Sequence, residues 1–291
     1  MPGRLMEDRG ARDVPGRAPT RRQTAARRHR LGQHFLKDQR VIQAILAAFA
    51  PGAGDRVLEV GPGRGALTEP LALRVATFVA VERDASLATV LQQRYQQEAD
   101  VTILEGDILE IDLEAELTGA AGGPARFRLL GNLPYSIATP LLVQTLARAD
   151  LFSDMTIMVQ REVARRMLAP TGTADYGPLA VLVALRSTDA RLVRDVPPGA
   201  FVPPPDVHSS VVQLDLPAHA ATDDTAMGIA LARQAFLQRR KKLVNTLGGT
   251  APRLVAGAMA SLGLAPRVRP EQVAPEDYVR LARCLGQEDN P

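Results

Sequence analysis

The sequence predicts an α/β protein in which a mostly parallel sheet is followed by a small all-helical C-terminal domain. Short apolar runs alternate with helical patterns between residues 56 and 168, as in sheets whose parallel strands are joined by helical crossovers. A glycine-rich turn at residues 61–65 directly follows the first of these runs. After residue 216 only helical patterns remain, which favours a separate helical domain.

The predicted elements begin near residue 31. Apolar residues at helical spacing follow Asp38, which is a suitable N-cap, and Pro51-Gly52 ends this helix. Strands are then expected at Arg56–Val60, Thr77–Val81, Val101–Leu104, Phe127–Leu130 and Met155–Val159. The helices that connect and follow them are expected at Ala66–Val75, Ala85–Gln96, Ala138–Ala147 and Arg161–Leu168.

Two further apolar runs are expected to complete the sheet, at Ala180–Leu185 and Ser210–Leu214, with the rigid segment Val202–Pro205 between them. The helical patterns that follow cover Thr225–Gln238, Leu243–Leu247, Arg253–Leu262 and Glu276–Leu285. We therefore predict a sheet domain at residues 31–216 and a helical domain at residues 217–291.

The composition supports a folded interior and limits the chemistry. Apolar residues make up 46% of the 291 residues, which is enough for the cores of two modest domains. Cys284 is the single cysteine, so no intramolecular disulfide can form, and metal-type Cys and His spacing is absent. No apolar run is long enough for a bilayer and no signal segment is evident. We expect a cytoplasmic protein with no metal and no membrane partner.

Positive charge is concentrated at the N-terminus. Residues 1–30 contain nine Arg and three acidic residues, a local excess of six, whereas the net charge of the whole chain is +3. The remaining chain is therefore net negative, and a basic surface must be sought in this arm or in local patches. We predict that residues 1–30 are a disordered Arg-rich arm. It is either a plain extension, with Met6 as another start, or an electrostatic anchor for RNA.

The glycine-rich turn has the sequence Gly61-Pro62-Gly63-Arg64-Gly65 and connects a strand to a helix. Glycines allow a sharp turn and a close approach of ligand to backbone, and the helix start offers free N–H groups. Dinucleotide-binding turns have the spacing G-x-G-x-x-G. The G-x-G-x-G spacing here instead resembles the turn that holds S-adenosylmethionine, with a plain tight turn as the alternative.

Two carboxylates follow the next two strands, at the edge where ligands bind in open α/β sheets. Glu82 lies at the end of the second strand and can accept hydrogen bonds from both hydroxyls of a ribose. Its alternative role is a surface charge. Asp107 follows the third strand and can bind the amino group of the cofactor's adenine, although an Asp before a loop is also an ordinary helix cap.

The motif Asn132-Leu133-Pro134-Tyr135 follows the fourth strand and predicts the transfer of a methyl group to an adenine amine. An adenine amine is a weak nucleophile because its lone pair is delocalised into the ring. The side-chain oxygen of Asn132 and the carbonyl of Pro134 can accept hydrogen bonds from its two N–H groups and so orient the lone pair at a sulfonium methyl. Tyr135 can stack on the flipped-out base. Positioning matters more than a strong base here, so we assign no general base; a β-turn without function is the alternative.

Two other segments are candidates for RNA contact. Phe201 opens a proline-rich segment and can cover the other face of the base, or else pack in the core. Arg239, Arg240 and Lys241 belong to a dense basic run, which predicts phosphate contacts on the helical domain. A merely solvated basic face is the alternative.

Taken together, these segments resemble the ribosomal RNA adenine dimethyltransferases that act on the small subunit. The similarity spans about residues 31–285 and rests on Leu31–Leu36, Gly61–Gly63, Glu82, Gly106-Asp107, Asn132–Tyr135, Met158–Val163, Tyr176–Leu179, residues 201–209, and Arg239–Lys241 with Asn245. Ser136 and Lys242 replace the more usual Asn and Thr, and neither is expected to touch the reacting amine.

The resemblance implies a Rossmann-like S-adenosylmethionine-dependent methyltransferase sheet with a helical RNA-binding domain. It implies dimethylation of two adjacent adenines in a loop near the 3′ end of small-subunit (16S) rRNA, within a pre-ribosomal 30S particle, by a monomer. By motif position, the residues that bind S-adenosyl-L-methionine are His34, Leu36, Gly61, Gly63, Glu82, Asp107 and Asn132. The assignment of His34 comes from the resemblance alone.

Three other functions are considered. A large-subunit rRNA adenine methyltransferase of the antibiotic-resistance type has similar sheet motifs, although Leu133 and the basic run favour the small-subunit class. A non-catalytic RNA- or DNA-binding factor can use the same fold, but intact Glu82, Asp107 and Asn132 argue against lost catalysis. The glycine spacing and the Asn-Leu-Pro-Tyr motif disfavour a nicotinamide-dependent oxidoreductase.

Overall fold

The computed structural model describes residues 33–134, 137–148, 150–217, 222–247 and 250–288. The predicted arm at residues 1–30 and the predicted stacking residue Tyr135 lie outside the described residues. The described residues from His34 onward belong to one compact unit. The predicted boundary between the sheet domain and the helical domain, at residues 216 and 217, stays a prediction.

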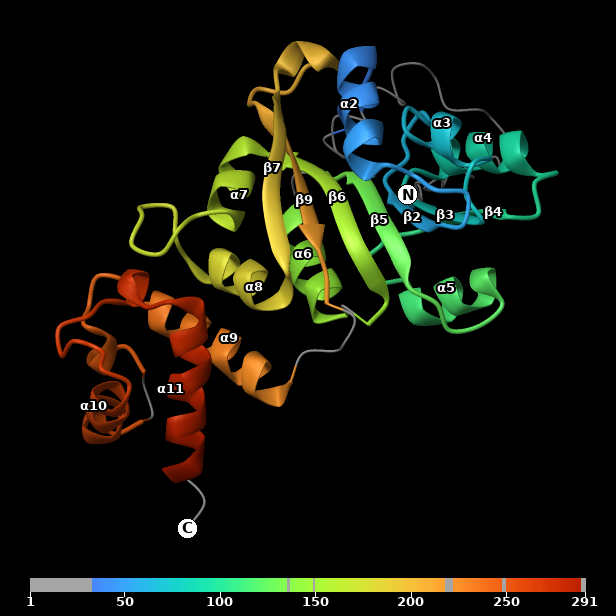
Figure 1. Ribbon diagram of the computed structural model, residues 1–291. Coiled ribbons are helices and arrows are strands. Elements are labelled where there is room, and N and C mark those ends of the chain that lie inside the picture. The colour runs from blue at the N-terminus through green and yellow to red at the C-terminus, as the bar shows by residue number, and fades with distance from the viewer. Residues whose placement is uncertain (1–32, 135–136, 149, 218–221, 248–249, 289–291) are drawn as a thin grey trace, which may run out of the picture. The chain divides into compact units, whose positions relative to one another are not determined.

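The described residues form a seven-stranded sheet in the order β4-β3-β2-β5-β6-β9-β7 (Figure 1). Strands β2 to β6 are parallel, and β9 runs antiparallel to its neighbours β6 and β7. Strand order reverses between β2 and β5, which opens a crevice at their carboxyl ends. The strands are β2 (Arg56–Val60), β3 (Thr77–Glu82), β4 (Val101–Glu105), β5 (Phe127–Asn132), β6 (Phe152–Gln160), β7 (Asp189–Val196) and β9 (Ser209–Asp215).

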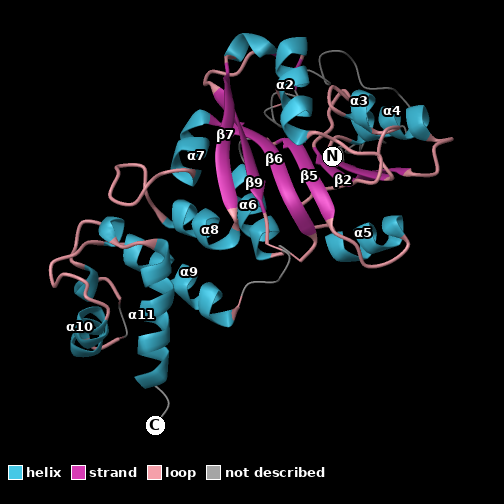
Figure 2. Cartoon of the chain, viewed as in Figure 1, coloured by secondary structure: helices cyan, strands magenta, loops and turns pink. Residues whose placement is uncertain are grey.

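Helices cover both faces of this sheet (Figure 2). The apolar cluster on one face contains side chains from α2 (Gln39–Phe49), α3 (Thr68–Leu71) and α4 (Ala85–Tyr95). The cluster on the other face contains side chains from α5 (Leu113–Ala121), α6 (Ala138–Ala147), α7 (Arg161–Met167) and α8 (Pro178–Arg186). The predicted cap of α2 is confirmed, because the Asp38 carboxylate accepts from the N–H groups of Arg40 and Val41.

The predicted strand at Ala180–Leu185 is wrong, because this segment belongs to helix α8. The helix is apolar on two sides. Leu179 and Leu182 pack in the core of the sheet, whereas Ala180 and Val181 pack against the C-terminal helices. Periodicity alone cannot separate a short run that is buried all round from a buried strand.

Strand β7 borders β9 in place of the predicted strand, and its pattern explains why the sequence does not indicate it. It is an edge strand with exposed charged residues, including Asp189 and Arg191. Helix α5 is also absent from the predicted elements, and α3 is much shorter than the predicted helix at Ala66–Val75. The other predicted strands in the sheet are confirmed within one or a few residues at their ends.

The described residues of the C-terminal part form helices and connecting loops and no strand, as predicted. It contains α9 (Asp223–Phe236), α10 (Pro252–Ser261), α11 (Pro275–Glu288) and two short 3₁₀ helices, Leu243–Asn245 and Pro270–Gln272. Its core includes Tyr176 and Val181 from the α8 region. The Tyr176 hydroxyl donates to the carbonyl oxygen of Val273 at 2.8 Å, which ties the helical part to the segment before α8.

A separate two-stranded sheet pairs β1 (Phe35–Leu36) antiparallel with β8 (Phe201–Val202). The Lys37 N–H extends this contact by donating to the carbonyl oxygen of Ala200 at 2.9 Å. The pairing brings two segments together that lie more than 160 residues apart, and the sequence pattern does not indicate it. No helix in the described part of the chain is long and apolar enough to cross a membrane.

Candidate functional site

Four of the predicted site segments meet at the carboxyl edge of the sheet. The glycine-rich turn follows β2, Glu82 ends β3, Asp107 follows β4 and Asn132 ends β5. These strands are direct neighbours, with Val60 opposite Gly131. The site therefore lies at the reversal of strand order, where open α/β sheets bind ligands.

The glycine-rich turn has the backbone conformation that its sequence predicts. Gly61, Gly63 and Gly65 have φ angles of 68°, 58° and 87°, a region that residues with a Cβ atom rarely adopt. A Cβ atom on Gly63 would also lie 3.2 Å from the Phe35 ring. Backbone and ring can approach this closely only because position 63 has no side chain.

Glu82 is buried, so the surface-charge alternative is wrong. Its Oε2 accepts from the Gly63 N–H at 2.9 Å, and its Oε1 accepts from the Asp84 N–H at 2.8 Å. Burial raises the pKa of Glu82, and these two hydrogen bonds counteract that rise. A carboxylate has about four acceptor positions, so this one has capacity for further donors such as hydroxyl groups.

Glu59 is a second buried carboxyl group in this region, and the prediction from sequence did not include it. Only 2% of the residue is exposed, and the Thr68 hydroxyl donates to its Oε2 at 2.6 Å. Burial raises the pKa of Glu59 to about 8, despite the Thr68 hydrogen bond, and the nearby Glu82 charge adds to the rise. Glu59 is therefore largely protonated at neutral pH. A single charged residue within the apolar strand Val57–Val60 was the available signal.

Asp107 has both local and longer-range partners. Its Oδ1 accepts from the Leu109 N–H at 3.1 Å, and its Oδ2 lies 3.4 Å from the Arg83 guanidinium. The first contact is that of an ordinary cap, which was the alternative to cofactor binding. The position at the carboxyl edge beside β3 remains compatible with both roles.

The Asn132 side chain is held by the main chain of a distant segment. Its Nδ2 donates to the carbonyl oxygen of His34 at 3.2 Å. Fixing the NH₂ group in this way also orients the side-chain oxygen, which is the predicted acceptor for the adenine amine. The Pro134 carbonyl accepts from the Ile137 N–H at 3.1 Å, and its second lone pair leaves capacity for another donor.

The β1–β8 pairing explains how His34 reaches this position. Nδ1 of the His34 ring lies 2.9 Å from the carbonyl oxygen of Pro203. When Nδ1 carries a proton, it donates a hydrogen bond to this oxygen. Leu36 is buried and pairs with Phe201. His34 thus contacts Asn132 through its backbone while its ring anchors it to the segment after β8.

Phe201 occupies the core and not the surface. Only 2% of the residue is exposed, and it belongs to the apolar cluster that contains side chains of α2. The predicted stacking of this ring on a base needs an exposed ring face. We therefore correct the assignment of Phe201 to core packing, which was its alternative.

The basic run is divided by the structure. Arg240 and Lys241 are exposed, and their side chains have no hydrogen-bond or ion-pair partner among the described residues. Arg239 is partly buried and donates from Nη1 to the carbonyl oxygen of Ala174 at 2.8 Å and from Nη2 to that of Thr173 at 3.1 Å. The three residues therefore do not share one environment, although they are adjacent in sequence.

Comparison with known proteins identifies the family. The sequence pattern of the family described as ribosomal RNA adenine dimethylase matches residues 24–287. The chain belongs to the ribosomal RNA adenine dimethylase family. The chain is thus an rRNA methyltransferase, as the glycine-rich turn and the Asn-Leu-Pro-Tyr motif predicted.

Curated relatives of this dimethylase act on the small subunit according to their names. A "Ribosomal RNA small subunit methyltransferase A" from Bordetella petrii is 42% identical over 263 residues, covering 89% of this chain and 95% of the relative. The protein of the same name from Aromatoleum aromaticum is 43% identical, covering 89% of this chain and 94% of the relative.

Solved structures confirm the methyltransferase fold of the dimethylase. A dimethyladenosine transferase from Plasmodium falciparum has a TM-score of 0.75 at 22% identity, covering 88% of this chain and 98% of the other. The 23S rRNA methyltransferase ErmE has a TM-score of 0.64 at 25% identity, covering 87% of this chain and 100% of the other. The predicted α/β sheet with a helical C-terminal part is therefore confirmed.

Proposed function

We propose that this dimethylase transfers methyl groups from S-adenosyl-L-methionine to the exocyclic amines of two adjacent adenines. The target is a loop near the 3′ end of 16S rRNA. The observation that carries the proposal is the position of Asn132 at the strand-order reversal, with its amide held by the His34 carbonyl. The small-subunit names of the relatives support the choice of substrate.

The residues at the carboxyl edge fit the cofactor. Gly61 and Gly63 provide a turn that a ligand can approach closely, and Asp107 lies one strand beyond Glu82. Glu82 is a buried carboxylate that accepts from the backbone N–H groups of Gly63 and Asp84 and has lone pairs left for the hydroxyls of a ribose. His34 and Leu36 complete the set by motif position. When bound, S-adenosyl-L-methionine supplies an electrophilic methyl group on a sulfonium.

The chain itself orients the target amine. Asn132 Oδ1 and the Pro134 carbonyl accept hydrogen bonds from its two N–H groups, which takes the nitrogen lone pair out of conjugation with the ring and directs it at the methyl group. Tyr135 stacks on the flipped-out base. We assign no general base because the nitrogen becomes acidic once it is alkylated, and because positioning supplies most of the effect.

The proposed partner is small-subunit rRNA within a pre-ribosomal 30S particle. Arg240 and Lys241 are exposed cations on the helical part and are suited to contact phosphates. We propose that the protein acts as a monomer in the cytoplasm, with a sheet domain at residues 31–216 and a helical RNA-binding domain at residues 217–291.

The test is a labelling experiment with tritiated S-adenosyl-L-methionine. The purified protein receives small subunits that lack adenine dimethylation and, in parallel, unmodified large-subunit rRNA, and the labelled nucleoside is identified after digestion. We expect dimethyladenosine from the small subunit alone. Label in large-subunit rRNA would instead favour the function named for ErmE, and label in neither would favour a non-catalytic RNA-binding factor.

A further inference from the structure

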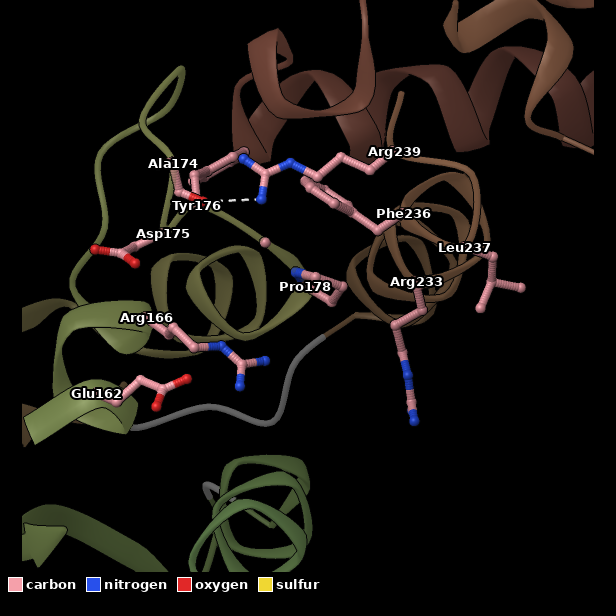
Figure 3. A pocket seen from close by; sticks show the side chains of 11 residues that line it. Glu162, Arg166, Ala174, Asp175, Tyr176, Pro178, Arg233, Phe236, Leu237 and Arg239 are labelled. Atoms are coloured by element: carbon pink, nitrogen blue, oxygen red, sulfur yellow. Dashed lines mark hydrogen bonds between the residues drawn. The ribbon is translucent and has the colours of Figure 1, made fainter. Parts of the chain in front are cut away.

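Arg239 lies just after α9 and contacts a segment more than 60 residues earlier in the chain. Two nitrogens of its guanidinium donate to two consecutive carbonyl oxygens, those of Thr173 and Ala174, in the loop between α7 and α8. Figure 3 shows the contact with Ala174. The planar fork of Arg matches such a pair of acceptors, and a Lys ammonium does not. Arg239 therefore commits two of its five N–H donors, one on each terminal nitrogen, to contacts within the protein.

A third segment joins this contact. The Gly172 N–H, in the same loop, donates at 2.7 Å to the carbonyl oxygen of Glu271 in the 3₁₀ helix Pro270–Gln272. Oε2 of Glu271 is buried and accepts no hydrogen bond from the described residues, and Arg239 Nε lies 3.9 Å from it. Arg239 thus also supplies a positive charge next to a buried carboxylate oxygen.

The same residues line an open groove with a volume of about 430 Å³. Arg166 of α7 and Arg233 of α9 line this groove, and their side chains have no hydrogen-bond or ion-pair partner within the described ranges. Figure 3 shows Arg166 and Arg239 on different elements around Pro178. The α7–α8 loop forms one side of the groove. A contact that holds this loop in place therefore also sets the distance between Arg166 on α7 and Arg233 on α9.

We propose that Arg239 is a positioning residue, which holds the α7–α8 loop against the helical part and so keeps the cationic surface in shape for RNA. Arg240 and Lys241 supply the phosphate contacts. The inference rests on the proposed function only in naming RNA as the ligand. Within the basic run, Arg239 binds the protein's own loop, whereas Arg240 and Lys241 bind RNA phosphates.

The decisive variants keep the charge. Arg239→Lys retains the positive charge but loses the two-pronged contact to Thr173 and Ala174, whereas Arg240→Lys is the matched control in the same run. We first measure amide hydrogen exchange in the free, full-length protein. Loss of a charged hydrogen bond predicts at least about tenfold faster exchange at the Gly172 and Tyr176 amides in Arg239→Lys, and no change in Arg240→Lys. Unchanged exchange in Arg239→Lys would overturn the proposal.

The second measurement is the affinity for undimethylated small subunits at several salt concentrations, with the KM for each substrate. We expect Arg239→Lys to bind the subunit more weakly and to have a higher KM for it. The slope of log affinity against log salt, the kcat and the KM for S-adenosyl-L-methionine should not change. Arg148→Lys, which changes an ion-paired Arg outside the basic run, should bind like the wild type. Wild-type affinity in Arg239→Lys would identify Arg239 as a simple phosphate contact and refute the positioning role. If the wild type itself does not bind subunits, the proposed function fails, while the exchange result still decides the role of Arg239.

Discussion

At the scale of single residues, the site depends on side chains whose orientation is set by one or two contacts. Asn132 is the clearest case, because its Nδ2 has a defined acceptor in the His34 carbonyl and its oxygen is thereby oriented. Gly131, next to it, is equally constrained. A Cβ atom there would lie 2.9 Å from the Val60 carbonyl oxygen, so β5 approaches β2 as closely as it does only without a side chain.

Replacing Asn132 by Ala should abolish methyl transfer while S-adenosyl-L-methionine binding largely survives. The variant removes the acceptor for the target amine, but it leaves the glycine-rich turn and Glu82 in place. Single-turnover methylation and calorimetric titration of the cofactor would separate the two effects. Full activity in this variant would contradict the proposed mechanism.

Glu59 predicts a particular dependence of stability on pH. Its pKa is about 8 in the folded protein, against an ordinary value of 4.5, so between these values the folded state binds more protons than the unfolded chain. The free energy of unfolding therefore falls as pH rises across this window and levels off above it. Gln resembles the protonated side chain, so Glu59→Gln should flatten the decline of the thermal midpoint between pH 5.5 and about 8.

The control for this prediction is Glu162→Gln, because Glu162 is exposed on α7. It should keep the wild-type pH profile. Parallel profiles for the wild type and Glu59→Gln would show that Glu59 does not carry the pH dependence.

At the scale of elements, the supporting sheet is tied to its first helix at the edge opposite to the site. The Arg128 side chain on β5 contacts Asp154 at 2.7 Å, Asp55 at 2.6 Å and the carbonyl oxygen of Phe49 at 2.5 Å. Its guanidinium also lies 4.2 Å from the centre of the Phe49 ring. One residue thus joins β5, β6, the start of β2 and the end of α2.

Arg128→Met should lower the free energy of unfolding by about 3 kcal/mol, because it leaves two partly buried carboxylates without their cation. Chemical denaturation would measure this. Arg148→Met is the comparison, since Arg148 forms ion pairs that are more exposed, and it should cost less than about 1 kcal/mol. Equal costs for the two variants would exclude a special role for Arg128.

At the scale of the whole molecule, α8 belongs to two cores at once. Leu179 and Leu182 pack with the sheet, and Val181 packs with Tyr278 and Leu281 of α11. The basic residues after α9 are therefore carried by a helical part that shares its core with the catalytic sheet. This sharing is also why the sequence pattern of α8 resembles a buried strand.

Neutralising Arg240 and Lys241 together should weaken RNA binding and reduce the slope of log affinity against log salt by about 1.5, because two phosphate contacts release their counterions. Neutralising Arg148, a partly exposed Arg at the end of α6, should leave the slope unchanged. Binding to small subunits at several salt concentrations would measure both. An unchanged slope in the double variant would remove these residues from the interface.

The sequence by itself determined the positions of strands β2 to β6 along the chain, the glycine-rich turn and the residues at the strand ends. These features depend on periodicity and turn chemistry, which are local. The tertiary structure decided the rest, because the rest depends on contacts between distant segments. Pairing of β1 with β8 places His34 against Asn132 and buries Phe201. Folding of the α7–α8 loop against the end of α9 gives Arg239 a different role from that of its neighbour Arg240.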